Sequence, residues 1–91
     1  PPTLTLTATP GTQYLRLTAS ARDNAGVASV DIYLDGAVVK TCYGAYASGC
    51  SIGQPVSTGT HNYKAVAIDT SYNIAYSPGP TDAEVSSVTV G

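Results

Sequence analysis

Alternation of apolar and polar residues with a period of two runs through most of this 91-residue chain. It is clearest in TLTLTAT, YLRLTASARD and VASVDIYLDG and returns in HNYKAVAID, whereas no stretch shows a helical period. Because successive side chains of a strand point to opposite faces, each stretch predicts a strand with one buried face. The sequence therefore predicts an all-β protein, with EVSSVTV as its closing strand.

Turn-forming residues separate these stretches. They are Pro10-Gly11, Asn24-Ala25-Gly26, Asp35-Gly36, the stretch from Gln54-Pro55 to Gly59, and Ser77-Pro78-Gly79-Pro80. Asp35-Gly36 predicts a tight hairpin, with AVVKT as the returning strand. About seven short strands spaced by roughly ten residues are typical of a two-sheet antiparallel β-sandwich.

The length allows one domain with one core. A chain of 91 residues buries roughly 60 to 70% of its unfolded surface on folding, which is enough for a modest core. We therefore expect a single domain over residues 1–91, with Pro1-Pro2 as the stiff end of an interdomain linker. The lack of Met indicates a segment of a longer chain.

One short motif, Ala-x-Ala-x-Asp, occurs twice, at residues 19–23 and 65–69. We expect both copies on central strands of opposing sheets, where small Ala side chains let the sheets approach closely. Each Asp would then end its strand and accept hydrogen bonds from amides of the following loop, at the same end of the sandwich. The larger core side chains are expected to be Leu15, Leu17, Val30, Ile32, Leu34 and Tyr63.

The charge balance excludes two classes of partner. Only 11% of the residues are charged, and four basic residues stand against six acidic ones, so neither a nucleic-acid-binding patch nor a polybasic membrane anchor is available. The sequence has no apolar run of about eighteen residues and no basic start followed by an apolar stretch. We expect a monomeric domain with no nucleic-acid or membrane partner.

The two cysteines, Cys42 and Cys50, occur in CYGAYASGC. This spacing differs from that of CxxC redox motifs and lacks the further ligands of a structural zinc site, so a disulfide is predicted, and two buried reduced thiols are the alternative. Closing so short a loop contributes about 2.6 kcal/mol in the chain-entropy description. An oxidised pair indicates an extracellular protein, either secreted or on a cell surface.

Two longer runs of residues resemble a known family. ARDNAGVASVDIYLDGAVV, followed by GTHNYKAVAIDTSYN, is similar to the bacterial immunoglobulin-like domains, whose layout is close to that of fibronectin type III modules. The matching positions are Ala21, Asp23, Asn24, Gly26, Val27, Val30, Ile32, Tyr33, Asp35, Gly36, Gly59, His61, Ala65, Ala67, Asp69 and Asn73. The resemblance implies an immunoglobulin-like two-sheet antiparallel β-sandwich from a secreted enzyme or surface protein.

Three features depart from the family pattern. Tyr72 stands where the family usually has Gly, so the turn before Asn73 is expected to differ. Residues 42–50 replace a plain polar stretch with a tethered loop that contains Tyr. Residues 77–83 resemble an insertion that interrupts or bulges the final strand.

The one histidine, His61, lacks the partners that catalysis requires. An extended strand would place Asp69 roughly 26 Å from it. Asp35 is expected at the same end as His61, but no GxSxG elbow or other nucleophile signature accompanies the two. We therefore expect a protein that is not an enzyme and needs no cofactor.

Four oxygen-bearing side chains are expected at one end of the sandwich: Asp23, Asn24, Asp69 and Asn73. Carboxylate and amide oxygens are the ligands that Ca²⁺ prefers. The Dx[DN]x[DN]G pattern of a calcium loop is absent, however. Capping of the loops by Asp is therefore the first interpretation, and a calcium site is the alternative.

Several tyrosines are expected at the surface. Tyr43 and Tyr46 belong to the tethered loop, and Tyr72 and Tyr76 flank the second unusual turn. Exposed rings stack on the apolar faces of sugars or anchor protein contacts, although single surface tyrosines are also common without any ligand.

A small apolar patch is expected on the outer face of one sheet. If Ala65 and Ala67 point inward, Val66 and Ile68 point outward, beside Tyr33. A neighbouring domain would cover this patch, or the three side chains shield one another as scattered surface apolar residues do.

These features favour a non-catalytic accessory module, a spacer or docking unit in a secreted bacterial multidomain protein such as an extracellular hydrolase or a surface protein. Its partners would be neighbouring domains of the same chain. The alternative is a module that binds carbohydrate, such as a polysaccharide, or a cell surface through the exposed tyrosines Tyr43, Tyr46, Tyr72 and Tyr76.

Overall fold

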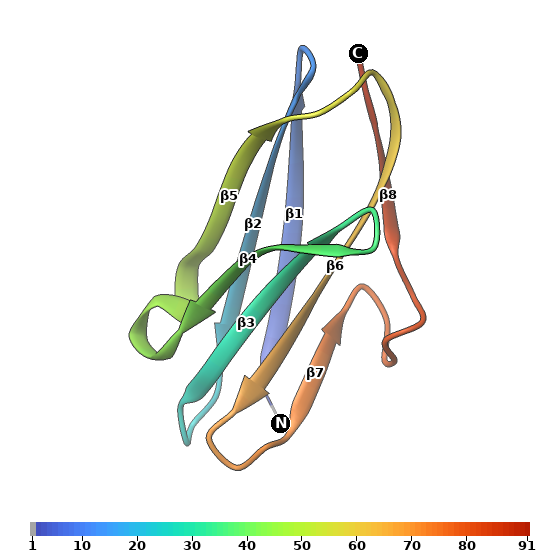
Figure 1. Cartoon of the computed structure of the whole chain (residues 1–91). Helices are drawn as coiled ribbons and strands as arrows, with labels where there is room; N and C mark the ends of the chain where they lie inside the picture. Colours follow the sequence, from blue (N-terminus) through green and yellow to red (C-terminus); the bar gives the residue numbers. More distant parts are fainter. Residues whose placement is uncertain (1) are drawn as a thin grey trace.

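The computed structural model describes residues 2–91 and shows two antiparallel sheets packed face to face (Figure 1). The elements are β1 (Thr3–Gly11), β2 (Tyr14–Arg22), β3 (Val27–Leu34), β4 (Ala37–Tyr43), the 3-10 helix η1 (Gly44–Gly49), β5 (Cys50–Pro55), β6 (Gly59–Asp69), β7 (Ile74–Ser77) and β8 (Ser86–Val90). The smaller sheet has the order β1-β2-β5, and the larger has the order β4-β3-β6-β7, with β8 also pairing with β6. The predicted all-β sandwich is confirmed, with eight strands in the described part of the chain.

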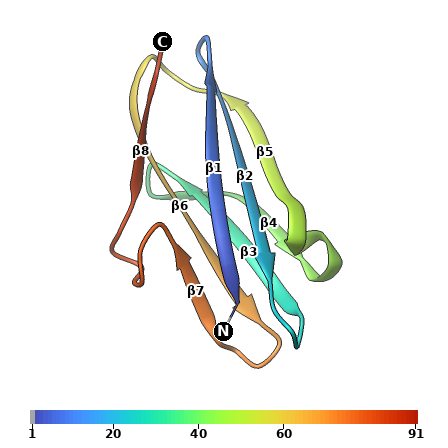
Figure 2. The same cartoon turned by 180° about the vertical axis from the view of Figure 1, so that it is seen from behind.

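The strands β2 and β6 lie inside their sheets, as predicted. Seen from behind, the three-stranded sheet faces the viewer with β2 between β1 and β5 (Figure 2). One buried core contains Leu15, Leu17, Ala19, Ala21, Val30, Ile32, Leu34, Ala65 and Ala67. Both Ala-x-Ala pairs therefore line the interior. Tyr63, predicted for the core, is half-buried and packs against this cluster from its position opposite Leu34.

Two strands and one helix have no counterpart among the predicted elements. β5 and β7 have the sequences CSIGQP and IAYS, which are too short and mixed to show a period of two. η1 is six residues long, too short for a repeating helical pattern. No helix in residues 2–91 combines the length and apolar character that crossing a membrane requires.

The predicted interruption of the final strand is confirmed. β7 pairs with Ala65 to Ile68 of β6, and β8 pairs with Gly59 to Tyr63 of the same strand. Residues 78–85 lie between β7 and β8, so they separate two strands that would otherwise form one.

A tight hairpin joins β3 to β4. Asp35 and Gly36 have φ angles of 51° and 86°, the left-handed values that a two-residue hairpin of this kind requires, so the predicted hairpin is confirmed. Pro2, predicted as part of a linker, is buried directly before β1. Pro1 lies outside the described residues.

Candidate functional site

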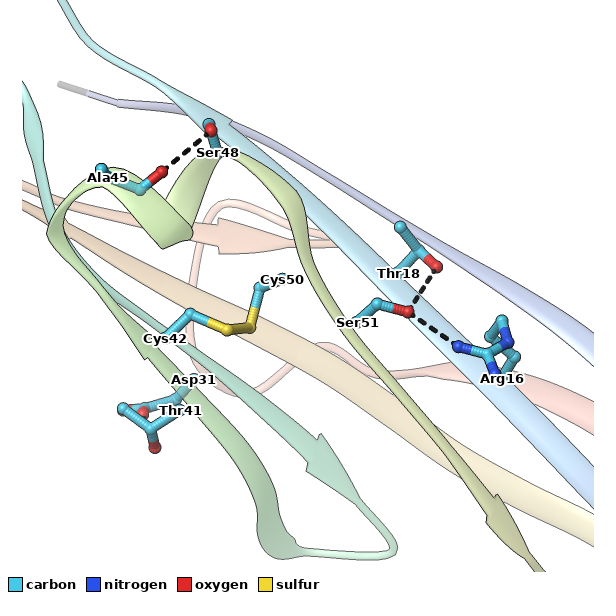
Figure 3. Close-up of a disulfide and its surroundings, with 9 residues drawn as sticks. All are labelled: Arg16, Thr18, Asp31, Thr41, Cys42, Ala45, Ser48, Cys50 and Ser51. Carbon is cyan, nitrogen blue, oxygen red and sulfur yellow. Dashed lines mark hydrogen bonds between the residues drawn. A yellow bond between two sulfur atoms is a disulfide. The ribbon is translucent and has the colours of Figure 1, made fainter.

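A disulfide joins the two sheets at one open edge of the sandwich. β4 is an edge strand of the larger sheet, and β5 is an edge strand of the smaller one. Cys42 on β4 and Cys50 on β5 form the predicted disulfide, with their Cα atoms 5.8 Å apart. Figure 3 shows this bridge between the two strands.

The helix η1, which connects β4 to β5, is held by packing as well as by the disulfide. Its residue Ala47 is buried in the core. The hydroxyl of Ser20 on β2 donates a hydrogen bond to the carbonyl of Ser48 at 3.1 Å. The hydroxyl of Ser48 donates to the carbonyl of Ala45 at 3.3 Å (Figure 3). These contacts hold the backbone of η1 in place, and with it the attachment points of the side chains that η1 exposes to solvent.

A groove of 640 Å³ lies over this junction. Its lining residues are Lys40, Thr41, Cys42, Tyr43, Gly44, Tyr46, Gly49 and Ser51. The volume falls in the range of about 300 to 1,000 Å³ that is usual for small-molecule sites. Tyr43 and Tyr46 are 69% and 81% exposed, so both rings remain available to a ligand.

One basic side chain lines the groove, and a second, Arg16 of β2, contacts a residue of its wall. Lys40 lines it from β4. On the β5 side, the guanidinium of Arg16 donates to the hydroxyl of Ser51 at 3.2 Å, and the hydroxyls of Thr18 and Ser51 are also 3.2 Å apart (Figure 3). Across the groove, the hydroxyl of Thr41 donates to Oδ1 of Asp31 at 2.5 Å. Arg16 thus holds Ser51 at the groove wall.

The four predicted tyrosines do not form one site. Tyr43 and Tyr46 share the groove, whereas Tyr72 lies in the loop between β6 and β7 and is 87% exposed. Tyr43 on β4 and Ile74 at the start of β7 lie in register across the larger sheet, three strand spacings or about 14 Å apart. Tyr76 is half-buried on β7.

Tyr72, which stands where the family usually has Gly, has an unusual backbone conformation. Its φ angle is 66°, in the left-handed region that Gly adopts without steric strain and other residues adopt only with strain. The backbone at this position is therefore one that suits the usual Gly, and Tyr72 adopts it at some cost.

The predicted apolar patch lies on the outer face of the larger sheet and is wider than expected. Val66 pairs with Tyr76, and Ile68 pairs with Ile74, so these four side chains form an apolar quartet on β6 and β7. Ile74 is 48% exposed. Tyr33 lies opposite Lys64, whose ammonium nitrogen is 4.8 Å from the centre of the Tyr33 ring. That cation covers one face of the ring.

His61 is buried and holds two loops together. Its Nδ1 lies 2.6 Å from Oδ2 of Asp35 in the β3–β4 hairpin, and its Nε2 lies 2.7 Å from the carbonyl oxygen of Ser57 before β6. An imidazolium donates from both nitrogens, so the charged ring satisfies both acceptors. The hydrogen bond to Asp35 is the main cause that raises the pKa of His61, and the same bond lowers the pKa of Asp35.

This pair predicts a pH dependence of stability. The contribution of His61 is fully present below its usual pKa of 6.5 and is lost as the pH rises through the raised pKa. The contribution of Asp35 is present above its usual pKa of 3.8 and is lost as the pH falls through the lowered value. The free energy of unfolding should therefore decline as the pH rises above 6.5 and through the raised pKa of His61, as measured by urea unfolding at a series of pH values. His61→Gln should flatten this alkaline decline; an unchanged slope would contradict the role of the pair.

Asp69 is buried and organises the β6–β7 loop. Its Oδ1 accepts hydrogen bonds from the amides of Ser71 and Asn73, each at 2.8 Å, and its Oδ2 accepts one from the side-chain amide of Asn73 at 2.9 Å. Burial raises the pKa of this carboxyl, but the hydrogen bonds from Asn73 and Ser71 together outweigh it, so the pKa lies below its usual value. The carboxylate stays charged and caps the loop, as predicted.

The two Ala-x-Ala-x-Asp turns meet at one end, also as predicted. Asp23 accepts a hydrogen bond from the amide of Ala25 at 2.8 Å, and the amide of Thr70 donates to the carbonyl of Gly26 at 3.1 Å. Asn24 is exposed. Among residues 2–91, no three His, Cys, Asp or Glu side chains are grouped as a metal site would require. The calcium alternative at Asp23, Asn24, Asp69 and Asn73 stays a prediction.

Several residues of the groove were not among the predicted site residues. Lys40, Thr41 and Ser51 line the groove together with Tyr43 and Tyr46, at the place where the disulfide joins β4 to β5. The spacing of Cys42 and Cys50 was the one signal in the sequence that pointed there. Ile74 was missed because a four-residue strand shows little alternation.

Comparison with known proteins agrees with the fold. A family described as bacterial Ig domain matches residues 2–65. A solved structure of fibronectin(III)-like modules of Clostridium thermocellum CbhA is similar, with a TM-score of 0.62 and 23% identity over 97% of this chain and 93% of that chain. No curated protein matches the sequence significantly. Because the family match covers more than half of the chain, and the sandwich follows the same layout, the chain belongs to the bacterial Ig domain family.

Proposed function

We propose that this chain is a non-catalytic accessory module of a secreted bacterial multidomain protein, in which it spaces and docks neighbouring domains. An extracellular hydrolase or a surface protein would be its parent. The disulfide supports an extracellular location, because disulfides persist in oxidising compartments. The side chains considered for catalysis support a structural role, since His61, Asp35 and Asp69 all hold turns.

The shape supports the spacer part of this proposal. The domain measures 40 Å along its longest axis and 24 Å and 17 Å along the others. β1 begins at one end of the sandwich and β8 finishes at the other (Figures 1 and 2). Domains attached on the two sides would be held apart along the long axis.

The apolar quartet on the outer face is the observation that carries the docking part. Val66, Ile68, Ile74 and Tyr76 occupy adjacent positions, and Thr41, Asp31 and Lys64 lie on the same face. Interfaces between domains of one chain are usually more polar than obligate interfaces, which suits this mixture. The proposed occupant is the adjacent domain of the same chain.

Charge placed in the quartet should separate the domains of the full-length parent. Ile68→Asp is expected to raise the largest dimension seen by small-angle scattering and to uncouple the calorimetric unfolding of this module from that of its neighbour, because a carboxylate buried without a partner is costly. Thr5→Asp, at an exposed position of the opposite sheet, is the matched control. Identical scattering and unfolding for both variants would overturn the docking proposal.

A second function, binding of carbohydrate or a cell surface, is favoured by the groove at the disulfide. Tyr43 and Tyr46 present exposed rings there, and a tyrosine offers a large apolar area at little entropic cost. The groove rather than the whole set of tyrosines is the proposed site, since Tyr72 and Tyr76 lie elsewhere.

Replacing Tyr43 and Tyr46 by Ala should abolish retention on insoluble polysaccharide, because the stacking surfaces are lost. Depletion of the protein from solution over the polysaccharide measures this. Tyr72→Ala removes an equally exposed ring outside the groove and should leave retention unchanged. Equal retention of all three proteins would contradict this second function.

A further inference from the structure

We propose that the groove between β4, η1 and β5 selects an acidic glycan, a chain of sugar rings that carry carboxylates. The inference rests on the second function proposed above and names the ligand chemistry of that site. Tyr43 and Tyr46 would stack on the sugar rings, and Lys40 and Arg16 would pair with the carboxylates.

The charge of the groove differs in sign from that of the whole chain. The chain is acidic overall, with four basic and six acidic residues. Yet Lys40 lines the groove, Arg16 is bonded to its wall residue Ser51, and none of the described lining residues is Asp or Glu. The charged side chain among the described lining residues is therefore the basic Lys40, which favours an anionic ligand.

One carboxylate, that of Asp31, contacts a wall residue of the groove just as Arg16 does, so Lys40 is the charge that faces the groove itself. Asp31 lies opposite Thr41 on the outer face of the larger sheet, accepts the hydrogen bond of the Thr41 hydroxyl, and does not line the groove. Lys64, by comparison, is already paired with Asp82, with its ammonium 2.8 Å from Oδ1. Arg16 differs, because the partner bonded to it at the groove is the neutral hydroxyl of Ser51.

The walls of the groove are held in place before any ligand binds. Lys40 lies two residues before Cys42 on β4, and Ser51 directly follows Cys50 on β5. The disulfide between the two cysteines, drawn in Figure 3, therefore sets the spacing of the two groove walls. Ala47 anchors the helix that carries Tyr46. A groove organised before binding loses little entropy when a ligand enters, which matters for a ligand held by weak contacts.

The ring and charge requirements can be tested separately by calorimetric titration of this chain. Oligogalacturonate is expected to bind, and its methyl ester, with the same rings but no charge, should bind at least several-fold more weakly. Lys40→Gln should weaken binding of the acid by about fivefold, the size expected for one exposed ion pair. Lys64→Gln makes the same change of net charge away from the groove and should have no effect. Binding of the acid should also weaken at about 1 M salt, where the screening length is only ~3 Å.

Four outcomes would overturn the inference. Equal binding of the acid and its ester would leave a carbohydrate site without selectivity for charge, so the second function would stand and this inference would fail. If neither the acid nor its ester bound, and the protein was not retained on polysaccharide, both the second function and this inference would fail. Equal binding of polyacrylate, which has carboxylates but no rings, or equal losses in Lys40→Gln and Lys64→Gln, would reveal attraction of any polyanion rather than recognition in the groove.

Discussion

Replacing Leu17 by Ala is expected to lower the free energy of unfolding by about 3 kcal/mol. Leu17 is 1% exposed at the centre of β2, between Ala8 on β1 and Ile52 on β5. Strands on both sides prevent the sheet from closing over the space that the missing carbons leave, so the cavity remains. A single domain is stable by only about 5 to 15 kcal/mol, so this one change removes a large share. Urea unfolding followed by circular dichroism measures it.

The neighbouring residue is the matched control. Thr18 lies on the same strand, is exposed, and faces away from the core. Thr18→Ala removes a surface hydrogen bond to Ser51 and should cost less than about 1 kcal/mol. If both variants lost the same amount, Leu17 would not lie in the core that the structure describes.

Removing the disulfide by Cys42→Ala together with Cys50→Ala is expected to lower stability by about 2.6 kcal/mol in the chain-entropy description. The loop between the cysteines closes two edge strands that belong to different sheets. No sheet hydrogen-bond ladder joins β4 to β5 among the described pairings, so the bond is the covalent link at this edge. Thermal unfolding measures the loss, and binding of oligogalacturonate should weaken in the same variant because the groove widens.

Reductant provides the control for this second prediction. Dithiothreitol should lower the melting midpoint of the native chain toward that of the double variant, and it should leave the double variant unchanged. A native chain whose melting is insensitive to reductant, although its thiols become free, would show that packing of Ala47 and the strands alone holds this edge.

The fold was largely predictable because the signal for a strand is local. Alternating side chains and Asp35-Gly36 describe β1, β2, β3 and β6 and one hairpin without reference to distant residues. β5 and β7 were missed for the same reason: each is short, and each becomes a strand by pairing with a neighbour, β5 with β2 and β7 with β6. Residues 44–49 form a helix too short to leave a periodic pattern.

The candidate site was predictable only in part. The sequence pointed to Tyr43 and Tyr46 through the cysteines that bracket them, but it grouped them with Tyr72 and Tyr76, which lie on other elements. It also separated Tyr76 from Val66, although the two pair directly across β6 and β7. Cross-strand neighbours depend on register, and register in a non-hairpin pair is set by packing of the whole sheet.

The sequence by itself determined which side chains of each main strand face inward, where the chain turns, and that Cys42 and Cys50 pair, because strand alternation and turn chemistry act over a few residues. Only the tertiary structure decided that β4 and β5 meet at an open edge, that Lys40 lines the resulting groove while Arg16 contacts its wall, and that four apolar side chains gather on β6 and β7. Those arrangements join residues far apart in the chain. They are set by how two twisted sheets pack over a shared core, which no local pattern encodes.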